Sequence, residues 1–174
     1  MHMLEGKKVA VLVADMYQEL EFWYPYLRLR EAGAEVVAVG PERREYKSKL
    51  GYPATAELGA EEVDPAGFHG VVVPGGYAPD YIRRSRKLVE FVGELGRSGK
   101  VVAAICHGPW VLASAGILRG RRVTSFFSIR DDLENAGATW VDEPVVRDGN
   151  LITAQIPRDL PRFLQEIIAA LAGS

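Results

Sequence analysis

The first forty residues of the chain alternate between two short apolar runs and one stretch of helical periodicity. Residues 9–14 and 35–39 are predicted to be buried strands, and the apolar residues of 19–32 recur at helical spacing until Gly33 ends the helix. A strand, a helix and a second strand joined by a tight connection form a βαβ unit. This unit places the chain in the α/β class.

The rest of the chain continues the same alternation without a repeat or linker. Strands are predicted at 71–73, 101–105, 145–146 and 151–154, an extended segment at 123–125, and helices at 85–96, 110–115, 129–135 and 161–171. The polar residues 43–58 are predicted to form a small hairpin or irregular excursion outside the main sheet. We predict a single domain, 1–174, with 1–6 as a flexible leader. Its fold would be a flavodoxin-like, three-layer α/β/α sandwich with a mostly parallel sheet and a site at the carboxyl ends of the strands.

Charge and cysteine content exclude several classes of protein. The 21 basic and 23 acidic residues give a net charge of −2, without a block of like charges that would bind nucleic acid or a membrane. The single cysteine cannot form an internal disulfide, and the first apolar run stops at Asp15, too short for a signal or spanning segment. We expect a cytoplasmic protein. No strand is followed by a Walker-type or dinucleotide-binding glycine pattern, and we expect neither cofactor nor metal.

The sharpest local pattern surrounds the cysteine. Ala104 and Gly108 stand two residues before and after Cys106, at the end of an apolar strand and the start of a helix that opens with Pro109. Small residues at these offsets are typical of a nucleophile elbow, in which a strained turn exposes the nucleophile. The start of the helix would lower the pKa of the thiol. The alternative is an inert cysteine in the core.

A nucleophile requires a base and donors for the developing negative charge. Of the three histidines, His2 lies in the leader and His69 at the far end of a strand, which leaves His107 as the base. The N–H groups of Gly75 and Gly76 are predicted oxyanion donors, supplemented by those of Cys106 and His107, although the two glycines could form only a tight turn.

Two acidic residues are expected at the same edge of the sheet. Glu21 begins the first helix, and close to a thiolate its carboxyl would have a raised pKa and would donate a hydrogen bond to sulfur. Asp80, in the loop after Gly76, would orient a histidine. Either acid could instead be an ordinary surface or helix-start charge.

With these residues identified, the chain resembles the ThiJ/PfpI family, in particular its intracellular-protease branch. The resemblance rests on four ordered motifs, at residues 21–25, 73–80, 104–109 and 131–138. It implies a Cys106–His107–acid triad whose acid, at the position of Asp80, comes from a neighbouring subunit of a homo-oligomer, a dimer or a trimer of dimers. It also implies a hydrogen bond from Glu21 to the sulfur and ready oxidation of that sulfur to the sulfinic acid.

Three positions depart from the family's pattern. Asp80 replaces a Glu, Phe126 replaces a Tyr whose hydroxyl would lie near the site, and Gln155 replaces an Arg. Members of the family are described as proteases, glyoxalases, deglycases and stress chaperones. These departures weaken the case for proteolysis more than the case for thiol chemistry.

Three functions are compatible with this pattern. The leading hypothesis is a cysteine-dependent hydrolase of PfpI type that acts on a small aldehyde or glycated adduct rather than on long peptides, in protection from stress or carbonyl damage. The second is a redox sensor or chaperone in which Cys106 is oxidised without turnover. The third is a flavodoxin-like binding domain without catalysis.

Overall fold

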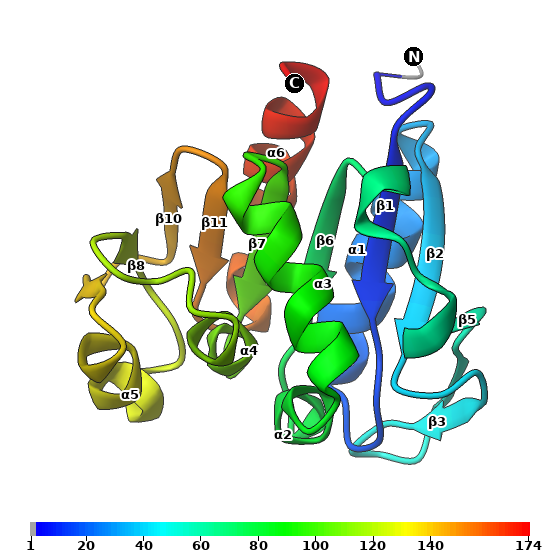
Figure 1. Cartoon of the computed structure of the whole chain (residues 1–174), viewed down its shortest axis with the longest axis horizontal. Coiled ribbons are helices and arrows are strands. Elements are labelled where there is room, and N and C mark those ends of the chain that lie inside the picture. The colour runs from blue at the N-terminus through cyan, green and yellow to red at the C-terminus, as the bar shows by residue number, and fades with distance from the viewer. Residues whose placement is uncertain (1–2) are drawn as a thin grey trace.

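The computed structural model describes residues 3–174 and contains a seven-stranded sheet with the order β10-β11-β7-β6-β1-β2-β5 (Figure 1). The strands of this sheet are β1 (Lys8–Leu12), β2 (Glu35–Gly40), β5 (Leu58–Gly59), β6 (Gly70–Val73), β7 (Val101–Ile105), β10 (Val145–Asp148) and β11 (Leu151–Ala154). Every neighbouring pair is parallel except β10 with β11. The mostly parallel sheet is therefore confirmed.

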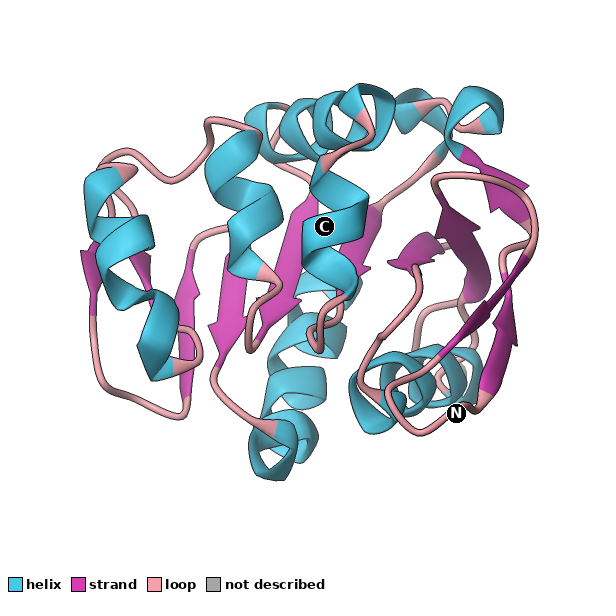
Figure 2. Cartoon of the chain, turned by 90° about the horizontal axis from the view of Figure 1, so that it is seen from below, coloured by secondary structure: helices cyan, strands magenta, loops and turns pink. Residues whose placement is uncertain are grey.

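Helices cover both faces of the sheet (Figures 1 and 2). On one face lie α1 (Glu19–Glu31) and α6 (Leu160–Ala172). On the other lie α3 (Arg86–Arg97) and α4 (Pro109–Ser114), with α2 (Ala78–Arg83) and α5 (Arg130–Asn135) packed beside them. This is the predicted three-layer α/β/α architecture, which brings the carboxyl ends of β1, β6 and β7 to the lower edge of the sheet in Figure 1.

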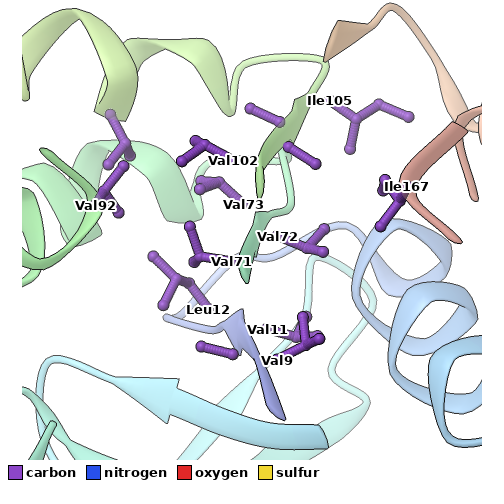
Figure 3. Close-up of a cluster of buried hydrophobic side chains, with 14 of the residues drawn as sticks. Val9, Val11, Leu12, Val71, Val72, Val73, Val92, Val102, Ile105 and Ile167 are labelled. Carbon is purple, nitrogen blue, oxygen red and sulfur yellow. The ribbon is translucent and has the colours of Figure 1, made fainter. Parts of the chain in front are cut away.

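The core follows from the composition of the strands. Every residue of β6 and β7 is buried and no residue in either strand is charged, because helices cover both faces. Figure 3 shows Val92 of α3 and Ile167 of α6 on opposite sides of these strands. Ser85 caps α3 by accepting a hydrogen bond from the Leu88 N–H. This cap fixes where the helix begins and therefore which of its residues face the sheet.

Two smaller sheets lie outside the main one. Strands β3 (Glu45–Lys47) and β4 (Pro53–Thr55) form an antiparallel pair, which confirms the predicted hairpin. Strands β8 (Arg122–Val123) and β9 (Thr139–Trp140) form a short parallel pair. Between residues 3 and 174, no helix has the combined length and apolar character that crossing a bilayer requires.

Three local predictions differ from the structure. Leu58, predicted in the excursion outside the main sheet, begins β5, which pairs with β2 at the edge of that sheet. Leu4 is fully buried and its N–H donates to the carbonyl of Ala32 at 2.9 Å, so the described part of the leader predicted at 1–6 contributes to the core. Residues 1 and 2, including His2, lie outside the described residues. Asp80 lies within α2 and not in a loop, because Pro79 fits the first turn of a helix and allows it to begin there.

Candidate active site

Cys106 occupies the corner between β7 and α4 in a left-handed backbone conformation. Its φ is 61°, a value shared by few residues other than glycine. Gly108 lies so close to β6 that a Cβ there would approach the carbonyl oxygen of Val73 to 2.4 Å. A larger residue would push the strand and the helix apart. The strained corner predicted from Ala104 and Gly108 is therefore present, and the half-buried thiol faces a pocket.

His107 lies directly against this thiol. Its Nδ1 is 3.2 Å from the Sγ of Cys106. The ring stacks on Phe126, with centroids 5.2 Å apart and planes inclined by 26°, and meets the edge of Trp110 at 5.1 Å. Burial lowers the pKa of His107, and the nearby charge of Lys49 lowers it further, against an opposing effect of Asp132. A neutral imidazole can accept a proton from the thiol.

Glu21 is the buried acid of the site. Its side chain has no solvent exposure, and Oε1 accepts a hydrogen bond from the Gly75 N–H at 2.9 Å. Within residues 3–174, its Oε2 has no hydrogen-bond partner. Burial raises the pKa of Glu21 to about 7, although the bond from Gly75 acts in the opposite direction. The carboxyl is therefore held near its protonation midpoint at neutral pH.

The same burial acts on the thiol. Desolvation and the negative charge of Glu21 raise the pKa of Cys106 to about 12, and the N–H groups of His107 and Gly76 offset this only in part. The predicted lowering of this pKa by the helix start is wrong, because removal from water outweighs the few N–H groups that face the sulfur. Burial therefore favours the thiol form of this sulfur, which lies beside the Nδ1 of His107.

Two of the four predicted oxyanion donors are already engaged. The Gly75 N–H is bonded to Glu21, and the Cys106 N–H donates to the carbonyl of Ala154 at 3.0 Å. The N–H groups of Gly76 and His107 instead face the sulfur. Gly76 has a φ of 73°, and a Cβ there would lie 2.5 Å from the carbonyl oxygen of Met16. Gly76 and His107 are therefore the donors available to an oxyanion.

Asp80 is not brought to the site within one chain. It lies on α2, where its carboxylate is paired with Arg84 one turn later, and it does not line the pocket around Cys106. That it acts across a subunit interface stays a prediction. Gln155 likewise lies outside the pocket, where its amide donates to Thr124 and Asp142.

The pocket around the thiol has a volume of about 480 Å³. Its lining comes from the ends of several strands and from the hairpin turn, and consists of Met16, Gln18, Glu21, Lys49, Gly76, Tyr77, Cys106, His107, Trp110, Phe126, Ile156 and Pro157. A larger groove of about 640 Å³ lies between α1 and the hairpin, but neither a thiol nor an imidazole lines it. Chemistry therefore belongs to the smaller pocket.

Sequence reasoning missed several residues of this site. Lys49 reaches the pocket from the turn between β3 and β4, and Ser128 places its Oγ 3.4 Å from the Nε2 of His107. The sequence predicts a helix at 110–115 but no role in the site for Trp110. Lys49 and Ser128 are brought to Cys106 by the folding of distant segments, and Trp110, in the helix that follows Cys106, belongs to no local motif that indicates a role.

Fold and site together define a flavodoxin-like α/β protein with a cysteine–histidine pair at the carboxyl edge of its sheet. The DJ-1/PfpI family matches residues 7–170. The chain belongs to this family, which confirms the resemblance drawn from its motifs.

Two deglycases are similar to this chain over nearly their full length. A deglycase of Pyrococcus abyssi is 44% identical, over 94% of this chain and 99% of the relative. The protein/nucleic acid deglycase 2 of Escherichia coli K12 is 40% identical, over 97% of this chain and 99% of the relative. A two-domain protein of Anabaena variabilis with DJ-1/ThiJ/PfpI-like and ferritin-like domains has a TM-score of 0.92 and 44% identity. That match covers 95% of this chain but only 48% of the longer protein.

Proposed function

We propose that this protein is a cysteine-dependent hydrolase of PfpI type that removes small carbonyl compounds or their adducts with amines. The observation that carries this proposal is the Cys106 thiol, held in a strained turn with its Sγ 3.2 Å from the Nδ1 of a neutral His107. A nucleophile paired with a base at this distance is the minimum requirement for covalent catalysis at a carbonyl. The deglycase names of two relatives, 44% and 40% identical, support the same class of substrate.

The site supports the following first step. The Cys106 sulfur bonds to the carbonyl carbon while its proton passes to the Nδ1 of His107, and the carbonyl π electrons move to oxygen. The N–H groups of Gly76 and His107 donate to that oxygen. Return of the proton from His107 to the oxygen gives a neutral hemithioacetal.

For a 1,2-dicarbonyl substrate the remaining steps balance without an external oxidant. The hydrogen on the first carbon leaves as a proton and one returns to the second carbon, while the hydroxyl proton of the hemithioacetal passes to the ketone oxygen. The hemithioacetal thereby becomes a thioester and the neighbouring ketone becomes an alcohol. Water then attacks the thioester, and the C–S bond breaks to release a 2-hydroxy acid and the thiol. His107 is placed to take the proton of the attacking water.

The dimensions of the pocket favour a small substrate. A volume of about 480 Å³ suits a small molecule or one modified side chain rather than an extended peptide. Phe126 adds a ring but no hydroxyl to this pocket. A redox sensor, in contrast, needs no base beside its thiol, whereas the Nδ1 of His107 lies 3.2 Å from the Cys106 Sγ. Turnover is therefore favoured over sensing.

We test this proposal with wild type and Cys106→Ala, each incubated with methylglyoxal, a methylglyoxal-modified amino acid and casein. Wild type is expected to consume the first two and to leave casein nearly intact. Cys106→Ala should lose at least about 10³-fold in rate, since without the thiol no hemithioacetal can form beside His107. Far-UV circular dichroism of both proteins controls for folding. Equal rates for the two proteins would remove Cys106 from the mechanism.

We further propose that the protein acts in the cytoplasm as a homo-oligomer in which Asp80 serves the site of a neighbouring subunit. The family resemblance supports this assignment. Its test is complementation between two inactive variants, Cys106→Ala and Asp80→Asn. Mixed after denaturation and refolding, they should recover part of the activity in hybrid oligomers. Full activity of Asp80→Asn alone would exclude a role for Asp80, and an inactive Asp80→Asn that recovers nothing in hybrid oligomers would exclude its action across the interface.

A further inference from the structure

The two nitrogens of His107 have different neighbours. Nδ1 lies 3.2 Å from the Cys106 sulfur, and Nε2 lies 3.4 Å from the hydroxyl oxygen of Ser128. A neutral imidazole carries one proton, on either nitrogen. Only the tautomer with its proton on Nε2 presents a lone pair to the thiol. The rate of proton transfer therefore depends on what Nε2 contacts.

We propose that Ser128 is a positioning residue that holds His107 in the tautomer protonated at Nε2. Its hydroxyl oxygen accepts the Nε2–H, which leaves Nδ1 free to take the proton of Cys106. The inference rests on the proposed function, because it assigns a partner to the base of that mechanism. It adds an orienting group within the same chain, where the triad implied by the family would take an acid from a neighbour.

The segment that carries Ser128 is hydrogen-bonded to the turn that contains Cys106. The Phe126 N–H donates to the carbonyl of Cys106 at 3.0 Å, and the 3₁₀ helix Phe127–Ile129 begins at the next residue. Phe126 stacks on the imidazole while Ser128 meets its edge. One segment thus sets both the plane of the ring and the partner of Nε2.

Within one chain, no carboxylate of residues 3–174 is hydrogen-bonded to this nitrogen. Asp132 is the acid that influences His107, but its Oδ2 accepts a hydrogen bond from the Trp110 indole at 2.8 Å. Asp80 is paired with Arg84. A hydroxyl is a neutral acceptor, so it selects the tautomer without the full stabilisation that a carboxylate would give the imidazolium.

The test combines kinetics with nuclear magnetic resonance of protein labelled with ¹⁵N at histidine. Ser128→Ala is expected to shift the ¹⁵N signals of His107 from the Nε2–H tautomer to a mixture, and to lower kcat on methylglyoxal about 10-fold with KM within twofold. This loss is smaller than the ~10²–10⁴ that a general base itself contributes. Ser128→Thr, which keeps the hydroxyl, should restore both readouts. Ser98→Ala, at the end of α3 and away from the pocket, is the matched control.

Two results would overturn the inference. One is a Ser128→Ala protein with unchanged tautomer and a kcat within twofold of wild type. The other is a tautomer that changes in Asp80→Asn but not in Ser128→Ala, which would assign Nε2 to the carboxylate of a neighbouring subunit. The resonance measurement needs no turnover. An inactive or cysteine-independent protein would therefore count against the proposed function while the tautomer was still measured.

Discussion

The interior of the sheet and its carboxyl edge differ in how well their residues are stabilised, although they meet between the consecutive residues Ile105 and Cys106. Val101–Ile105 of β7 is a run of buried aliphatic side chains in regular strand pairing. The next residue, Cys106, is left-handed, and beside it a buried carboxyl of Glu21 has one oxygen without a partner in residues 3–174. In the interior, each residue has a favourable backbone conformation and buried apolar contacts. At the edge, the surrounding packing maintains a strained backbone and a desolvated carboxyl, which are unfavourable by themselves.

The contrast shows where each kind of substitution should act. Changes in the strand interior alter packing, so they should alter stability and leave the chemistry intact. Changes at the edge should alter activity, and some should increase stability because they remove a strained or desolvated group.

The largest expected change in stability comes from Gly108→Ala. This substitution tests whether the fold requires the close backbone contact between β6 and the corner after β7. In Gly108→Ala the new Cβ would meet the Val73 carbonyl oxygen at 2.4 Å, and two backbone atoms of Ile105 lie within 3.0 Å. We expect a loss of at least about 4 kcal/mol in the free energy of unfolding, or failure to fold.

Urea denaturation of Gly108→Ala measures this loss. Gly67→Ala is the matched control, because a Cβ at Gly67 would have nothing within 4 Å. A Gly108→Ala protein as stable as the control would show that the corner can widen at little cost.

A smaller effect, of opposite sign, is expected from Glu21→Gln. The folded pKa of Glu21, about 7, lies above the unfolded value of 4.5, so its contribution to stability is complete below pH 4.5 and is lost as the pH rises to about 7. Because Gln carries no charge, Glu21→Gln should be more stable than wild type at pH 8, by on the order of 3 kcal/mol. At pH 4.5 the two proteins should be nearly equal.

Thermal or urea unfolding at the two pH values measures the difference. Glu19→Gln, on the same helical turn, is the control with the opposite sign, since hydrogen bonds from Ser48 and Leu50 leave its pKa below the ordinary value despite desolvation. Removing that charge should reduce stability above pH 4.5. Equal stability of Glu21→Gln and wild type at pH 8 would mean that ionisation of the buried carboxyl does not destabilise the folded protein.

The smallest expected change in stability comes from a substitution in the interior of the sheet. Ile105 is fully buried and immediately precedes the nucleophile. Ile105→Val should lower the free energy of unfolding by about 1 kcal/mol, the ordinary cost of removing one buried methylene. Its kcat/KM should stay within twofold of wild type, measured on methylglyoxal. A tenfold loss of activity would break the separation between the two regions.

Much of the architecture was predictable because its causes are local. Apolar runs and helical spacing identified the strands and helices of the main layers except β5 and α2, with differences of one or two residues at their ends. The small residues around Cys106 predicted the strained turn, which the φ of 61° confirms. Asp80 was misplaced in a loop, because a six-residue helix leaves too short a periodic pattern to recognise.

By itself, then, the sequence determined the α/β class, the order of its layers and the position of the nucleophile, since periodicity and turn chemistry act between neighbouring residues. Only the tertiary structure decided the state of that nucleophile. The carboxyl of Glu21 approaches it from α1, the N–H of Gly75 is taken by that carboxyl, and Ser128 reaches the far side of His107. Desolvation and charge depend on atoms brought together across the fold, and no local pattern records them.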